Sequence, residues 1–114
     1  MTKVTYWDRR DCQELAVNGH AEQTGPGQVS AVCAAISAIT QTLYTNIQME
    51  EEKGQIKADG DARSGHMWIR AWTTSENHAA IRNMFQFTVI GLKSIAEEYP
   101  DKLKVKEEKR NGGI

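Results

Sequence analysis

The sequence has few cysteines, almost no net charge and no long hydrophobic run, and each shortage excludes a class of protein. Its two cysteines, Cys12 and Cys33, lack the C-x-x-C spacing of zinc and thioredoxin-like sites, and two thiols do not make a disulfide scaffold. We therefore expect reduced thiols, no metal and no cofactor. Because no apolar stretch is long enough for a membrane span or a secretory signal, the expected location is the cytoplasm.

Positive and negative charges are nearly balanced. Fourteen basic and fifteen acidic residues leave a formal net charge of −1, so no overall field attracts nucleic acid or an anionic membrane, and neither is expected as a partner. The 114 residues make one small domain with little core to spare, which favours a homodimer. The expected domain covers residues 1–106, and residues 107–114 are expected to form a polar tail.

The spacing of apolar residues predicts five strands and two helices. Strands are predicted at residues 4–7, 14–18, 54–58, 66–72 and 102–106. Spacings of three and four predict one helix after the Gly-Pro-Gly break at 25–27 and a second after Ser75, its expected N-cap, which Pro100 ends. Residues 59–65 are expected to be a mobile tip. The order ββαββαβ favours an α+β fold, in which two helices pack on a mostly antiparallel sheet.

Each predicted helix carries one apolar stripe that should face the core. In the first helix the stripe consists of Val29, Val32, Ile36, Ile39, Leu43 and Ile47. In the second it consists of Ile81, Phe85, Thr88, Leu92, Ile95 and Tyr99.

His20 and Cys33 stand at the two ends of a glycine-rich loop. Cys33 falls in the first turn of the first helix, where unpaired backbone N–H groups and the helix dipole favour a thiolate and can form an oxyanion hole. His20 ends the second strand, and the loop is long enough to fold back onto the helix start. A thiol and an imidazole in contact are the minimum for acyl transfer through a thioester.

The same residues also fit a purely structural role. Free cysteine is among the most buried residue types, so Cys33 can equally fill the helix stripe while His20 ends a strand. Cys12 is interpreted as structural. His66 and His78 lack the sequence context of His20, and we interpret both as ordinary polar residues with no metal to bind.

Two segments closely resemble the signature of the bacterial ribosomal-processing cysteine proteases, the Prp family. The first is Gly19-His20-Ala21, followed by a glycine-rich gap and the sequence VCAAISA at 32–38. The second is GLKSIAEEYP at 91–100, which is similar to the closing helix and Tyr-Pro stop of that family. The resemblance runs in the same order over nearly the whole chain.

The resemblance implies a cytoplasmic, homodimeric cysteine endopeptidase. Such an enzyme removes an N-terminal extension from a large-subunit ribosomal protein, at a site preceded by bulky apolar residues, and a related phage activity processes head or scaffold proteins. By this likeness Cys33 is the nucleophile and His20 the general base and acid. Ser37 matches a serine of the motif, although a packed helix residue is an equal alternative.

One position departs from the family pattern. The family commonly has an aspartate three residues before the cysteine, where this chain has Ser30. Ser30 either accepts a hydrogen bond from the imidazole or caps the helix. We further expect the loop between the two catalytic candidates to order over an extended peptide substrate. Its residues are Gln23, Thr24, Gly25, Pro26, Gly27 and Gln28.

A second function remains open beside the peptidase. Trp68 and Trp72 share one face of a strand whose other face is also apolar, which indicates a strand covered on both sides, by helices and by a second subunit or a peptide. Simple core packing is the alternative. Together with the departure at Ser30, this leaves a catalytically weak or inactive dimeric peptide-binding module of the same fold as the alternative function.

Overall fold

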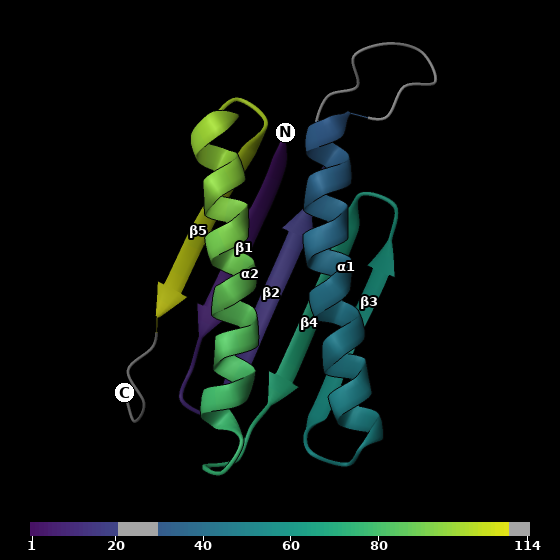
Figure 1. Cartoon of the computed structure of the whole chain (residues 1–114), viewed down its shortest axis with the longest axis vertical. Coiled ribbons are helices and arrows are strands. Elements are labelled where there is room, and N and C mark those ends of the chain that lie inside the picture. The colour runs from purple at the N-terminus through teal and green to yellow at the C-terminus, as the bar shows by residue number, and fades with distance from the viewer. Residues whose placement is uncertain (21–29, 110–114) are drawn as a thin grey trace.

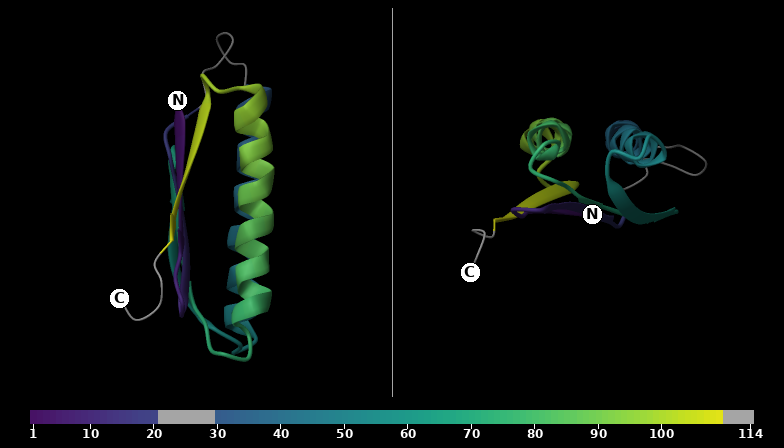
Figure 2. Two further views of the ribbon diagram at one scale, coloured as in Figure 1. Left: turned by 90° about the vertical axis from the view of Figure 1, so that its left-hand side faces the viewer. Right: turned by 90° about the horizontal axis from the view of Figure 1, so that it is seen from below.

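In the computed structural model, residues 1–20 and 30–109 are described, and they form one five-stranded sheet covered on one face by two helices (Figures 1 and 2). The elements are β1 (Thr2–Asp8), β2 (Cys12–Asn18), α1 (Ala31–Glu52), β3 (Lys57–Arg63), β4 (His66–Trp72), α2 (His78–Glu98) and β5 (Leu103–Lys109). The predicted α+β class and the order ββαββαβ are confirmed. None of the helices in the described part is long and apolar enough to cross a membrane.

The sheet joins two hairpins and one crossover strand. Its order is β3-β4-β2-β1-β5, and every pair is antiparallel except β1 with β5. The pair β2 and β4 joins the hairpins, in a register that places Asn18 opposite His66. The end of β2 therefore lies beside the turn between β3 and β4, at the same end of the molecule as the start of α1 (Figure 1).

The core lies between the helices and one face of the sheet. The buried residues of α1 include Val32, Ile36, Leu43 and Ile47, as the helical spacing predicts, and α2 contributes Ile81, Phe85 and Leu92. The ring of Phe85 stacks on that of Tyr6 with 6.2 Å between centroids. Burying each such side chain stabilises the fold by about 1.5–3 kcal/mol. Val29 lies outside the described residues.

The prediction of a mobile tip at residues 59–65 is wrong. Residues 57–63 form β3, which pairs with β4 so that Gly60 lies opposite Ile69, and only Ser64 and Gly65 remain between the strands. Asp59-Gly60-Asp61 has the composition of a turn, but Gly60 is needed here for another reason. A Cβ at this position would lie 2.7 Å from Trp68 O, 2.9 Å from Cδ1 of Ile69 and 3.0 Å from Cε2 of Tyr44, so the glycine leaves room for β4 and for a side chain of α1.

Several boundaries also differ from the sequence prediction. β1 and β2 each begin two residues earlier than predicted, and the strand predicted at 54–58 begins at Lys57. Asn77, not Ser75, is the N-cap of α2, and its side chain instead accepts a hydrogen bond from Thr74 N at 2.8 Å. Strand β5 continues to Lys109, beyond the expected end at Lys106, because its whole length pairs with β1. Residues 110–114 of the expected tail lie outside the described residues.

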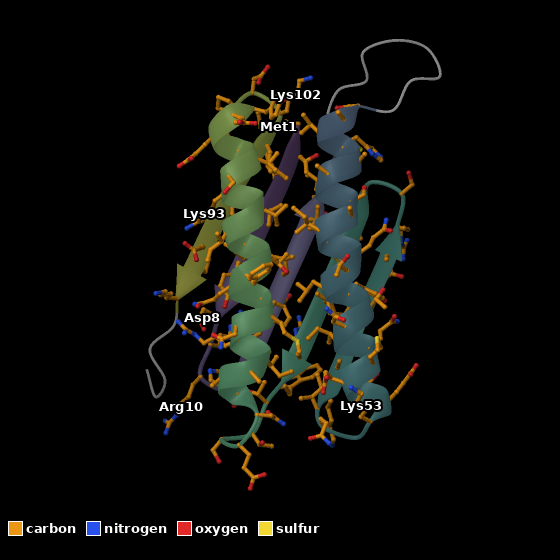
Figure 3. The ribbon with its side chains drawn as sticks, in the orientation of Figure 1. Met1, Asp8, Arg10, Lys53, Lys93 and Lys102 are labelled. Carbon is orange, nitrogen blue, oxygen red and sulfur yellow. The ribbon has the colours of Figure 1, made fainter. Side chains whose placement is uncertain are left out.

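A polar network ties α2 to β1 at the end of the sheet remote from Met1 and Lys102 (Figure 3). Arg82 Nη2 donates to Asp8 Oδ2 at 2.9 Å, and Gln13 Nε2 donates to Asp8 Oδ1 at 2.7 Å. Tyr6 Oη in turn donates to Oε1 of the fully buried Gln13. Burial alone would raise the pKa of Asp8, but the hydrogen bonds from Arg82 and Gln13 outweigh it and hold that pKa below its ordinary value of 3.8.

We expect Asp8→Asn to destabilise the protein by about 1–3 kcal/mol at neutral pH, because the guanidinium of Arg82 loses its charged acceptor. A lowered folded-state pKa contributes stability above the unfolded value, and that contribution is lost as the pH falls through the folded value. The gap between wild type and Asp8→Asn should therefore close below pH 3.8. Urea unfolding followed by tryptophan fluorescence measures it, with the exposed Asp11→Asn as control. A gap that persists at low pH would contradict this account of Asp8.

Candidate active site

His20 follows β2 directly, and the sheet fixes the backbone that leads to it. Gly19 N donates to Gly65 O at 2.9 Å, which continues the β2–β4 pairing by one position beyond Asn18 and His66. The side chain of His20 lies over Gly65: a Cβ built on Gly65 would be 2.5 Å from His20 Nε2. The imidazole is therefore at the rim of the sheet, next to the turn between β3 and β4.

Cys33 is the third residue of α1, and Ser30 is its N-cap. Ser30 is buried, and its Oγ accepts a hydrogen bond from Cys33 N at 3.3 Å. The first backbone bond of the helix runs from Ala34 N to Ser30 O at 3.0 Å. The N–H groups of Ala31 and Val32 come before this bond, so no carbonyl of the helix can accept from them. They carry the positive end of the helix dipole, which lies in the same first turn of α1 as the half-buried Cys33.

One pocket brings the two residues together. A pocket of about 380 Å³ is lined by both His20 and Cys33 and also by Ser37, one turn further along α1. A larger pocket of about 630 Å³ lies between α1 and α2 around Phe87. None of the residues lining the larger pocket is titratable or carries a thiol, so we assign the chemistry to the smaller one.

The sequence prediction missed part of this pocket. Arg63, Ser64, Gly65 and His66 line it as well, and all belong to the turn region of the second hairpin. From the sequence, Arg63 falls in the predicted mobile tip and His66 is predicted to be an ordinary polar residue. The signal that could have found them is the β2–β4 register, which sets His66 opposite Asn18 with 2.5 Å between Nδ1 and Oδ1.

Ser30 and His78 do not line this pocket. Ser30 acts as the helix cap, which is the structural alternative considered for it, and it does not line the pocket. Residues 23–28, the expected substrate loop, lie outside the described residues. His78 begins α2, where its Nδ1 is 2.7 Å from Thr73 Oγ1. Within residues 1–20 and 30–109, no group of three or more His, Cys, Asp or Glu residues could hold a metal ion.

The two cysteines differ sharply in their surroundings. Cys12 is 5% exposed, in β2 on the face of the sheet away from the helices, and burial raises the pKa of its thiol. Cys33 is half-buried and opens into the pocket that also contains His20. Of the two thiols, only Cys33 can be reached by a peptide without local unfolding.

A thiol at a helix start and an imidazole at a strand end, lining one pocket, are the side chains that a cysteine peptidase requires. Comparison with known proteins agrees with this class. The family model described as cysteine protease Prp matches residues 1–104. The chain therefore belongs to the Prp family of cysteine proteases.

Solved structures share the fold. The essential ribosomal processing protease Prp of Staphylococcus aureus, in complex with a covalently linked product peptide, is 21% identical and superposes with a TM-score of 0.72, covering 95% of this chain and 100% of its own. The same protease with a substrate peptide is 20% identical, with a TM-score of 0.69 and the same coverage. A Streptococcus mutans protein is 20% identical, with a TM-score of 0.65 and 96% of each chain covered. None of the curated proteins compared with the chain matches it.

Proposed function

We propose that this chain is a cysteine endopeptidase in which Cys33 is the nucleophile and His20 is the general acid and base. The observation that carries the proposal is the shared pocket: the thiol comes from the start of α1, the imidazole from the end of β2, and both line one pocket of about 380 Å³. Membership of a cysteine protease family supports the reaction type.

The reaction proceeds in two steps. Cys33 Sγ, as the thiolate, attacks the scissile carbonyl carbon, and the N–H groups at the start of α1 stabilise the oxyanion that forms. Imidazolium of His20 then donates its proton to the leaving amine, and the C–N bond breaks to give a thioester on Cys33. In the second step His20 takes a proton from water, the hydroxide attacks the thioester, and the thiolate and the free carboxylate product are released.

The helix cap refines the assignment of the oxyanion donors. Because Cys33 N already donates to Ser30 Oγ, the N–H groups of Ala31 and Val32 are the better candidates for the developing negative charge. Ser30 then supports catalysis through the helix start rather than through the imidazole. We assign Ser37, which lines the same pocket, to contact with the bound peptide.

The substrate that we propose is an extended peptide segment of a ribosomal or phage structural protein, cut in the cytoplasm. The support is family membership and the structures of the Staphylococcus aureus relative, which are complexes with a substrate peptide and with a product peptide. The alternative of a weak or inactive peptide-binding module is favoured by one observation, the absence of a carboxylate at Ser30.

Cleavage of peptides that carry paired aromatic residues, followed by mass spectrometry, separates the two functions. We expect Cys33→Ala to abolish cleavage and His20→Ala to slow it by about 10²–10⁴-fold, because proton transfer to the leaving amine is lost. Cys12→Ala is the matched control and should cleave like the wild type. Binding of the peptides without cleavage by the wild-type protein would instead identify the binding module.

We also propose that the protein is a homodimer that pairs through the face of the sheet opposite the helices. Figure 2 shows both helices on one side of the sheet and no described element on the other. Trp7, Trp68 and Trp72 alternate with core-facing residues and therefore lie on this open face. The guanidinium of Arg70 lies between two of them, 5.4 Å from the ring of Trp68 and 5.6 Å from that of Trp72. Rigid aromatic and arginine side chains of this kind are enriched at the centres of protein interfaces.

Sedimentation velocity tests the dimer. We expect Trp72→Lys, which puts a charge on the open face, to convert the wild-type dimer into a monomer. The comparison variant is Phe87→Lys on the helix face, where Phe87 is 82% exposed; it should remain a dimer. A monomeric wild type, or dissociation caused by Phe87→Lys but not by Trp72→Lys, would contradict the proposed interface.

A further inference from the structure

We propose that Gly65, in the turn between β3 and β4, is a positioning residue for His20. The inference rests on the proposed role of His20 in catalysis. It concerns how this chain holds the imidazole in place although Ser30 Oγ is engaged with Cys33 N and Ser30 does not line the pocket.

The turn brings Gly65 against the backbone that carries His20. Only Ser64 and Gly65 separate β3 from β4, so the turn is tight, and Gly65 adopts a left-handed conformation with φ +75°. Its carbonyl oxygen accepts the hydrogen bond from Gly19 N at 2.9 Å. The residue immediately before His20 is thereby fixed to the turn.

The missing side chain of Gly65 provides the space in which the imidazole lies. A Cβ at Gly65 would be 2.5 Å from His20 Nε2, 3.0 Å from Cδ2 and 3.3 Å from Cε1. All three nearest atoms belong to the outer edge of the same ring, so His20 lies directly against the Cα of Gly65. Two contacts therefore hold the histidine: a backbone hydrogen bond through Gly19 and a ring contact with the turn.

The pocket shows why this contact bears on catalysis. Gly65, His20 and Cys33 line the same 380 Å³ space, so a ring pushed off Gly65 changes its position relative to the thiol. The clash would fall on the outer end of an exposed side chain, which can rotate at little cost to the fold. A side chain at Gly65 should thus displace the imidazole without unfolding the protein.

Gly54 provides a matched control for the strain of a left-handed residue. Its φ is +78°, close to that of Gly65, but a Cβ built on it would have nothing within 4 Å. Gly54 lies between α1 and β3 and does not line the pocket. Gly65→Ala and Gly54→Ala should therefore lower Tm by similar amounts, because both place alanine in the left-handed region.

The two variants should differ at the active site. For Gly65→Ala we expect kcat for peptide cleavage to fall by about 10- to 100-fold with KM nearly unchanged, since a small misplacement of a catalytic group costs rate rather than binding. The ring signals of His20 in ¹H–¹³C NMR spectra, assigned by comparison with His20→Ala, should shift. For Gly54→Ala both kcat and the His20 signals should match the wild type.

Three outcomes would overturn the inference: unmoved His20 signals in Gly65→Ala, a shift of those signals with unchanged kcat, or a Gly65→Ala protein that fails to fold when Gly54→Ala folds. Failure to fold would mean that alanine strains the backbone of the turn and does not simply displace the His20 ring. If the wild-type protein cleaves no peptide, the proposed function fails, and the NMR comparison alone still decides whether Gly65 places the ring.

Discussion

The antiparallel pairing of β2 with β4 is the constraint on which the rest of this structure depends. It joins the two hairpins into one sheet, and its register sets Asn18 opposite His66, so that the chain leaves β2 beside the turn of the second hairpin. A register shifted by one residue would turn Leu15 and Val17 away from the core and would separate Gly19 from Gly65. The same pairing therefore builds the core and places the imidazole.

The two ends of the sheet are held by different kinds of contact. At the end that holds Asp8, an ion pair with Arg82 and the buried amide of Gln13 lock β1 to α2. At the end that holds His20, the contacts are a glycine backbone, a tight turn and a helix cap. The ion pair and the buried amide stabilise the first end, whereas the second end keeps a pocket that Cys33 and His20 line.

Much of the fold could be predicted from the sequence because helices and strands place their buried residues at regular spacings. The spacing of Val32, Ile36, Leu43 and Ile47 gave the buried face of α1 directly. The strand predicted at 54–58 corresponds to β3, but its continuation to Arg63 was missed because Asp59-Gly60-Asp61 has turn composition. The close approach of Trp68 O, Ile69 and Tyr44 to Gly60 is a tertiary contact. Local propensity carries no information of that kind.

Part of the candidate site could likewise be predicted from the sequence, and part of it could not. Cys33 and His20 could be selected because they stand in a recognisable pattern at a helix start and a strand end. Gly65 and His66 are part of the pocket only through the pairing of strands that are distant in sequence, and the cap bond from Cys33 N to Ser30 Oγ becomes visible only with coordinates. Residues that act through their neighbours are the ones that a sequence pattern does not mark.

The central claim is that the helix start and His20 make the sulfur of Cys33 a nucleophile, and its most direct test is the rate at which iodoacetamide alkylates each cysteine at mildly acidic pH. Peptide mapping by mass spectrometry resolves the two sites. The account predicts that Cys33 reacts much faster than the buried Cys12, and that His20→Ala removes most of this advantage. Slow alkylation of both cysteines at equal rates would contradict it.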